Sequence, residues 1–472
     1  MIRLFFRIFD SSLRSIHDTA RSCFCSRAVV VSILLRCAVH AEGNAEAPAP
    51  SSETFVTSSL GAGWSLHVQS TLVDQWHGAY SAAYSGDNSF LNTQEDEHTL
   101  SLSLYLGHPL WRGADIFYNP EGFQGYGLSR TLGVAGFPNG EAVKSGYGSV
   151  HYNTSRLFLR QVFGLGGETE QQTDDVLQCA RVVDVNRLIF SVGKFSAGDF
   201  FDGNAYSHDP RTQFLNWSLM DSGAWDYPAD VVGFTGGAVL EWNTRTWMLH
   251  YGLFMEPRVS NGARLDPHLE QAHGQILQFD QRYLVGGHAG TLRPFVYWNQ
   301  ARMGNYDQAV HRATVQGGAD ITATAAYRSK LGFGLSWDQA LAQDLGIFAR
   351  LSHNDGRTES WAFTEIDSSA ALGLSMKGQR WGRAQDTLGL ACVENAISGS
   401  HQRYLAAGGS GLILGDGALS PAREQVLEVY YDLVPLSWAR LSVDYQLLHN
   451  PGYNSDRGPN VSVYSIRTHL QY

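Results

Sequence analysis

The last residues of the chain, from Val461 to Tyr472, alternate strictly between two sets of side chains. One set is Tyr464, Ile466, Thr468, Leu470 and Tyr472, and the other is Val463, Ser465, Arg467, His469 and Gln471. Because successive strand side chains point to opposite faces, the segment predicts a strand with one apolar and one polar face. A transmembrane barrel needs such a closing strand, with lipid on its apolar face. A soluble sandwich with a polar outer face also fits the alternation.

The lengths of the connections favour the barrel. Alternating segments are separated by short connections, such as 243–246 and 434–438, and by long ones, such as 196–228 and 450–460. Outer-membrane barrels have short turns at one end and long loops at the other. We therefore predict an all-β fold, a transmembrane antiparallel barrel of about 16 strands. The strands are expected to begin near Trp64, His98, Gly113, Val150, Arg187, Ala229, Trp247, Gln275, Thr291, Arg328, Leu345, Ser368, Thr387, Gln425, Trp438 and Val461.

A helical membrane protein is excluded, because no run of eighteen apolar residues follows the N-terminal region. Within residues 1–41, five arginines precede the apolar run 28–39, and Val39-His40-Ala41 resembles a cleavage site. We interpret 1–41 as a signal peptide, 42–60 as a flexible lead-in rich in Ala, Pro and Ser, and 61–472 as one barrel domain.

The balance of charge excludes nucleic acid as a partner. Residues 1–41 carry six Arg and two Asp, a net charge of +4, so removal of this segment changes the net charge from -11 to -11 - 4 = -15. Cys179 and Cys392 are then the remaining cysteines, and whether they pair is left open.

The third outer loop of the expected barrel, 196–228, is unusually long. Its aromatic residues argue against disorder, since so much apolar surface is stabilised by packing. They are Phe200, Phe201, Tyr206, Phe214, Trp217, Trp225 and Tyr227. We expect this loop to fold into the barrel and narrow it, with its aspartates, including Asp199, adding negative charge. A lid packed on other outer loops is the alternative.

Two arginines of the strand that is expected to begin near Val150 should face the lumen. Arg156 and Arg160 share one face, whereas Leu157, Leu159 and Phe163 occupy the other. Exposing an arginine to lipid at mid-bilayer costs roughly 2–4 kcal/mol, so the register is strongly determined. Arginines facing aspartates and aromatic rings suit a neutral polyhydroxy solute. A structural ion pair within the lumen explains each arginine equally well.

Catalytic and cofactor motifs are missing from the sequence. It contains no G-x-S-x-G, H-E-x-x-H, Walker, G-x-G-x-x-G or zinc-type C-x-x-C pattern. We therefore expect no enzyme activity, no cofactor and no bound metal.

Six stretches of the chain share a common resemblance. The longest is GADIFYNPEGFQGYGLSRTLGVAGFPNGEAVKSG (113–146), and the others are 156–168, 193–217, 224–230, 354–367 and 450–459. Together they resemble the carbohydrate-selective porins of the OprB type. The resemblance implies a 16-stranded outer-membrane barrel that passes glucose and related neutral sugars by facilitated diffusion through an eyelet of arginines and acids. The candidate substrate-binding residues are Arg156, Arg160, Glu121, Asp199 and Trp217.

The expected partners are small neutral sugars and the lipid of the bacterial outer membrane. Three alternatives remain: a general porin or one for acidic or basic solutes, a barrel enzyme of the outer membrane, and a secreted sugar-binding sandwich. Both a monomer and a trimer are compatible with the sequence.

Overall fold

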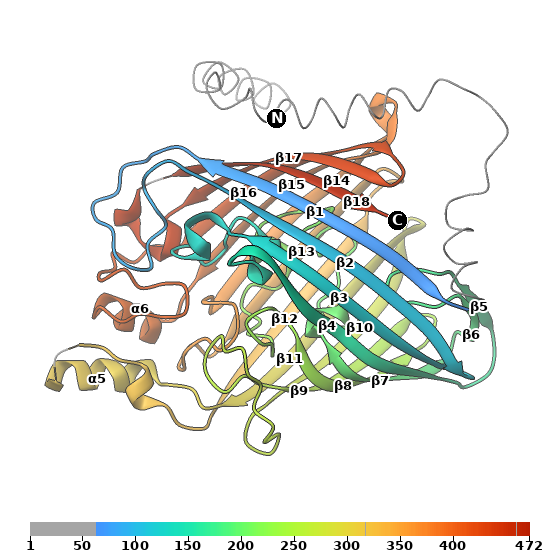
Figure 1. Ribbon diagram of the computed structural model, residues 1–472, viewed down its shortest axis with the longest axis horizontal. Helices are drawn as coiled ribbons and strands as arrows, with labels where there is room; N and C mark the ends of the chain where they lie inside the picture. The colour runs from blue at the N-terminus through green and yellow to red at the C-terminus, as the bar shows by residue number, and fades with distance from the viewer. Residues whose placement is uncertain (1–62, 317, 459) are drawn as a thin grey trace. The chain divides into compact units, whose positions relative to one another are not determined.

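Sixteen strands of the computed structural model close into one antiparallel barrel, as predicted (Figure 1). The structure describes residues 63–316, 318–458 and 460–472, so the expected signal peptide and lead-in lie outside it. The barrel strands are β1 (Ser65–His77), β2 (Glu95–Trp111), β3 (Ala114–Gly125), β4 (Tyr147–Gly164), β7 (Arg187–Phe195), β8 (Thr235–Asn243), β9 (Trp247–Met255), β10 (His273–Val285), β11 (His288–Ala301), β12 (Arg328–Ala340), β13 (Leu345–Asn354), β14 (Ser368–Gly378), β15 (Arg383–Ala396), β16 (Glu424–Leu436), β17 (Ala439–His449) and β18 (Val461–Gln471). Each pairs with the next along the chain, and β18 returns to β1.

The closing strand β18 has the two faces that its alternation predicts. Arg467 is 1% exposed and donates from Nη1 to the carbonyl oxygens of Pro210 (2.6 Å) and Gln213 (2.7 Å), which belong to a loop inside the barrel. Leu470, on the other face, is 36% exposed. Beyond the end of β18, the backbone N–H and C=O of Tyr472 pair with those of Val68 in β1 at 2.9 and 2.8 Å. The backbone hydrogen bonds that close the barrel between β18 and β1 therefore extend as far as Tyr472.

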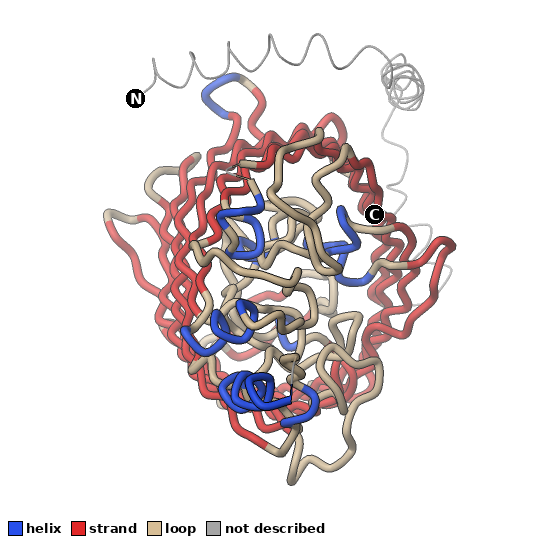
Figure 2. Tube along the Cα trace, turned by 90° about the vertical axis from the view of Figure 1, so that its left-hand side faces the viewer, coloured by secondary structure: helices blue, strands red, loops and turns tan. Residues whose placement is uncertain are grey.

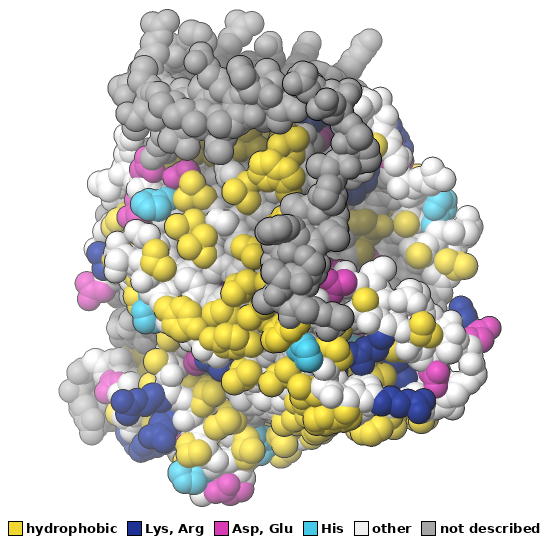
Figure 3. Space-filling model, turned by 45° about the vertical axis from the view of Figure 1, so that its right-hand side comes forward, with side chains coloured by type: hydrophobic (Ala, Val, Ile, Leu, Met, Phe, Trp, Pro, Cys, Tyr) yellow, Lys and Arg dark blue, Asp and Glu magenta, His cyan; other side chains and the backbone are white. Residues whose placement is uncertain are grey.

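The outer surface of the strands is apolar, as a lipid-facing surface must be. Figure 3 shows hydrophobic side chains spread across the strands. The outward residues include Leu102, Leu157, Phe163, Leu240, Leu277, Phe333, Leu351, Leu372 and Val443. Exposed aromatic side chains mark the short-turn end, among them Trp111, Trp242, Trp381, Trp438 and Tyr472. The part of the chain that the structure describes holds no helix long and apolar enough to cross a membrane.

The long connections gather at the opposite end and fill the bore, as the view along the barrel shows (Figure 2). They carry the helices α4 (Trp217–Met220), α5 (Tyr306–Gln316) and α6 (Gly399–Ala406), together with η1 (Leu128–Thr131), η2 (Gly140–Lys144), η3 (Ala197–Asp199), η4 (Thr322–Thr324), η6 (Pro451–Tyr453) and η7 (Ser455–Arg457). A further single turn, η5 (Gln379–Trp381), lies at the short-turn end.

Loop 3, residues 196–234, lies inside the barrel. Polar side chains of the wall hold its backbone: Glu428 of β16 accepts from the N–H groups of Leu215 (2.6 Å) and Asn216 (2.9 Å). Three strands further along the wall, Arg350 of β13 donates to the carbonyl oxygen of Leu219 at 2.8 Å. Apart from the single turns η3 and α4, this buried loop has no regular secondary structure, so its backbone groups require such partners.

One connection at the short-turn end is long. Residues 165–186 form a separate two-stranded sheet of β5 (Thr169–Gln172) and β6 (Arg181–Asp184). Gly166 and Gly167 adopt φ values of +84° and +94°, which favour glycine and turn the chain out of the wall. The rule that one end of the barrel has short turns therefore does not hold at this connection. Cys179 and Cys392, the two cysteines in the described residues, are both free.

Candidate channel constriction

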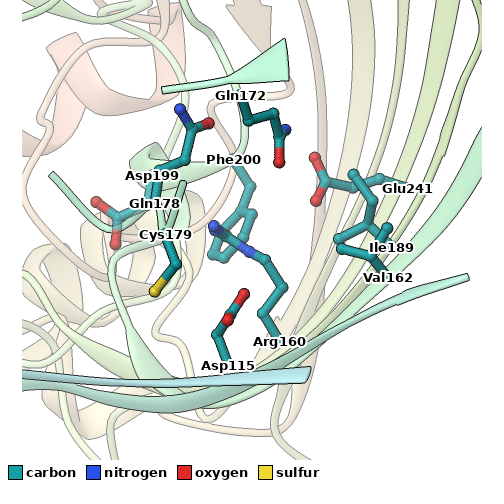
Figure 4. Close-up of a pocket in the computed structure, with 10 residues that line it drawn as sticks. All are labelled: Asp115, Arg160, Val162, Gln172, Gln178, Cys179, Ile189, Asp199, Phe200 and Glu241. Carbon is teal, nitrogen blue, oxygen red and sulfur yellow. The ribbon is translucent and has the colours of Figure 1, made fainter. Parts of the chain in front are cut away.

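Two cavities lie in the lumen, one on each side of a charged constriction. The outer cavity, about 150 Å³, is lined by residues that include Arg130, Phe137, Val143, Val231 and Phe363. The inner cavity, about 180 Å³, is lined by residues that include Asp115, Arg160, Asp199, Phe200 and Glu241 (Figure 4). A chain of contacts connects the two cavities. Val231 of the outer cavity packs against the cluster that contains Phe234, and the Phe234 ring lies under Arg156. Arg156 pairs with Asp199, which lines the inner cavity. We call the charged cluster between the two cavities the candidate constriction, or constriction for short; its members are Glu121, Glu141, Lys144, Arg156, Lys194, Asp199, Arg211, Asp230 and Phe234.

A bidentate ion pair between Arg156 and Asp199 lies at the centre of the constriction. Arg156 donates from Nε and Nη2 to the two carboxylate oxygens of Asp199 at 2.8 and 2.6 Å, and from Nη1 to Asn119 Oδ1 at 2.8 Å. Asp199 also caps η3, because its Oδ2 accepts from the Ser196 N–H at 3.0 Å. The side chains of Arg156 and Asp199 remain 11% and 16% exposed. Strand β4 and loop 3 therefore present one donor group and one acceptor group at the surface of the lumen.

The ring of Phe234 is surrounded by three cations. Arg156 Cζ lies 5.1 Å from its centroid, and the Nζ atoms of Lys144 and Lys194 lie 5.6 and 5.9 Å away. A turn fixes the ring in place, since Asp230 Oδ1 accepts from the Phe234 N–H at 3.0 Å and Gly233 adopts φ +93°. These distances are typical of cation–π attraction, which holds the cations around the ring.

A second charge network lies deeper in the packing. Arg211 of loop 3 contacts Glu121 Oε1 (3.1 Å) and Glu141 Oε1 (3.3 Å), while Lys144 Nζ is 3.9 Å from each carboxylate. Ser103 and Ser101 donate to Glu121 (2.6 Å) and Glu141 (2.7 Å). Burial opposes ionisation of Glu141, but Arg211 and Lys144 lower its pKa to about 2. The network joins the wall to loop 3 and to the connection between β3 and β4, which carries η2.

The structure pairs Arg156 with Asp199 and places Glu121 in the neighbouring charge network, whereas Arg160 shares only the lining of the inner cavity with Asp199. Arg160 lies against the inner cavity, where Nη1 donates to the carbonyl oxygen of Leu177 at 2.7 Å. Its guanidinium is 5.2 Å from the ring centroid of Phe117 and 5.4 Å from that of Phe158.

Trp217 lies in the packed interior. It is 2% exposed, stacks on Phe137 at 5.2 Å and contacts the rings of Tyr227 and Phe363. Because Phe137 and Phe363 line the outer cavity, Trp217 supports that cavity from behind.

Sequence reasoning missed several members of the constriction. Lys144 and Glu141 lie in the stretch that resembles the family, but no alternation singles them out within a loop. Phe234 directly precedes β8, and the predicted start of this strand near Ala229 places Phe234 within the strand and not in a loop. In the described residues no group of His, Cys, Asp and Glu is arranged to hold a metal ion.

A closed antiparallel barrel with an apolar outer surface, long loops folded inside and a charged constriction defines the class of outer-membrane porins. The family model described as "Carbohydrate-selective porin, OprB family" matches residues 87–472, and the chain belongs to this family. At the level of the family the protein is a carbohydrate-selective channel of the outer membrane, not an enzyme.

The fold is similar to solved porins. The high-pH structure of Pseudomonas putida OprB matches with a TM-score of 0.68 and 15% identity, over 89% of this chain and 97% of that one. Its low-pH structure matches with a TM-score of 0.48 and 12% identity, over 89% and 96%. The outer-membrane channel DcaP of Acinetobacter baumannii gives 0.47 and 11%, over 88% and 98%. None of the curated proteins matches the sequence.

Proposed function

We propose that this porin passes small neutral sugars, such as glucose, by facilitated diffusion. The observation that carries the proposal is the balance of charge in the constriction. Its cations are Lys144, Arg156, Lys194 and Arg211, and its acids are Glu121, Glu141, Asp199 and Asp230, so four positive and four negative charges sum to zero. A balanced constriction favours neither cations nor anions over a neutral solute.

Hydrogen bonding gives a neutral sugar an advantage over a merely small solute. Arg156 and Asp199 present charged donors and acceptors side by side, and sugar hydroxyls both donate and accept. Passage requires binding that is strong enough to favour entry and weak enough to allow release. A millimolar dissociation constant, about -4 kcal/mol, meets both conditions.

Permeation by size-matched sugars tests the proposal directly. We expect liposomes containing the protein to swell faster with glucose than with gluconate or glucosamine, which carry opposite charges on a similar skeleton. Equal rates for the three solutes would contradict selectivity for neutral sugars and leave a general porin.

The variant Asp199→Asn tests the role of the central pair. It leaves Arg156 without its counter-charge, so the constriction becomes net positive, and we expect the ratio of gluconate to glucose permeation to rise by roughly 2–10-fold. Asp344→Asn is the matched control, because Asp344 pairs with Arg380 in a turn outside the constriction and Arg380 is 56% exposed. A ratio unchanged in Asp199→Asn, or raised equally in Asp344→Asn, would contradict this role.

A further inference from the structure

Segment 165–186, the long connection at the short-turn end, forms a floor beneath the inner cavity. Gln172, Gln178 and Cys179 of this segment line the cavity opposite the barrel wall. In Figure 4, Gln172 of β5 points into the cavity from the side opposite Asp115 and Arg160. In an outer-membrane barrel the short-turn end faces the periplasm. The inner cavity is therefore the last chamber before the exit.

The floor is tied to strands on both sides of the mouth. On one side His67 of β1 lies 3.3 Å from Asp174, and on the other Asn243 of β8 donates to the carbonyl oxygen of Val185 at 2.8 Å. Between these strands Asp115 of β3 pairs with Arg181, and Arg160 of β4 binds Leu177. In barrel order β1 and β8 enclose β2, β3, β4 and β7, so the segment bridges this whole arc.

The wall is shaped to receive the segment. Cys179 is 5% exposed and packs in the same apolar cluster as Phe117 and Phe158. A Cβ atom at Gly107 of β2 would lie 2.9 Å from the Phe117 ring and 3.1 Å from Cys179 Sγ. The absence of a side chain at Gly107 thus allows the close approach of Cys179 to β2.

The lining of the inner cavity has the chemistry of a sugar site. Asp115, Asp199 and Glu241 supply acceptor oxygens, Gln172 and Gln178 supply amides, and the Phe200 ring supplies an apolar face. Arg160 also lines the cavity, where its Nη1 donates to the carbonyl oxygen of Leu177 and so joins the wall to the floor.

We propose that the inner cavity is a second sugar-binding site, completed by segment 165–186, that a sugar occupies after the constriction and before release. This inference rests on the proposed passage of neutral sugars. It assigns the segment a function that a short turn cannot have, because a short turn would leave the cavity without its amide-lined floor.

Glucose-induced block of the ion current through single channels in planar bilayers tests the second site. We expect Gln172→Ala to raise the dissociation constant of glucose by roughly 2–10-fold, the effect of one lost hydrogen bond. Gln171→Ala is the matched control, because Gln171 is the neighbouring residue of β5, is exposed and does not line the cavity. We expect it to match the wild type. A second variant lacks residues 168–183, which leaves a short turn, and should weaken glucose binding at least as much as Gln172→Ala.

The outcomes separate the two proposals. Weaker glucose binding in Gln172→Ala and in the deletion variant, but not in Gln171→Ala, supports the second site. Wild-type glucose affinity in both Gln172→Ala and the deletion variant overturns it, while the proposed function stands if the wild type still prefers glucose to gluconate. A wild-type channel without glucose block and without that preference overturns both.

Discussion

Arg211 and Lys144 share the same two carboxylates, yet they lie in different surroundings. Arg211 approaches Glu121 and Glu141 to 3.1 and 3.3 Å, donates further hydrogen bonds to Gln69 and Tyr105, and is 7% exposed. Lys144 is 3.9 Å from each carboxylate and 18% exposed. One side of the constriction is therefore packed between loop and wall, and the other side faces the lumen.

The difference separates charges that hold the loop from charges that act on a solute. A charge left unpaired inside the packing is strongly destabilising, because neither water nor a partner compensates it. A charge at a wet surface contributes little to stability but acts on any ion that passes. We therefore expect removal of Arg211 to affect folding and removal of Lys144 to affect selectivity.

The largest effect is expected for Arg211→Gln. It leaves Glu121, whose side chain is 0% exposed, without its close cation, and breaking a buried pair costs roughly 3–5 kcal/mol. Thermal unfolding in detergent measures the loss. Arg403→Gln is the control, because Arg403 and its partner Asp307 are 58% and 55% exposed and such pairs contribute at most about 1 kcal/mol. Equal midpoints for the two variants would refute the assignment of Arg211 to the packed side.

The sequence predicts this barrel well because the pattern and the physics coincide there. Lipid on one side and water on the other impose a period of two, which identifies β18 and places Arg156 in the lumen. Loop interiors obey no such period. Lys144 and Phe234 lie in different loops and meet at 5.6 Å only in the folded protein, while a local turn to Asp230 sets the backbone of Phe234.

Segment 165–186 shows the same limit at the other end. Its floor depends on contacts with β1, β3, β4 and β8, which are distant in sequence. Alternation of short and long connections is an average property of barrels. It therefore cannot predict that segment 165–186 forms the separate sheet of β5 and β6.

A medium effect is expected from pH, through His401 of α6 in the long loops. Burial disfavours its charged form, but the hydrogen bond to Asp367 (3.3 Å) and the carboxylate of Glu365, 3.6 Å away, raise its pKa from 6.5 to about 9. Because the folded-state pKa is the higher one, His401 stabilises the loops fully below about pH 6.5, and this contribution is lost as pH rises through about 9. We expect a loss of about 1–3 kcal/mol over this range.

Protection factors from hydrogen exchange of the backbone amides of α5 and α6, in which the base-catalysed rate of unstructured peptide is divided out at each pH, measure this loss. Tyr306 of α5 stacks on His401 at 4.2 Å, so both helices should open more readily as pH rises. His401→Gln should abolish the pH dependence, whereas His268→Gln, at a side chain 62% exposed, should retain it. If the protection of the α5 and α6 amides still fell between pH 6.5 and 9 in His401→Gln, His401 would be excluded as the source of the pH dependence.

The smallest effect on stability, below about 1 kcal/mol, is expected for Lys144→Gln, because its two ion pairs are long and partly hydrated. The same variant changes the constriction from four cations and four acids to three and four, and so makes it net negative. We expect the ratio of glucosamine to glucose permeation in liposome swelling to rise. In Asp199→Asn the ratio of gluconate to glucose rises instead, so the two variants favour solutes of opposite charge. Two results would count against this expectation: Lys144→Gln unfolds as readily as Arg211→Gln, or it leaves the glucosamine to glucose ratio unchanged. Either result would contradict the idea that side-chain exposure decides whether a charge in the constriction acts on folding or on selectivity.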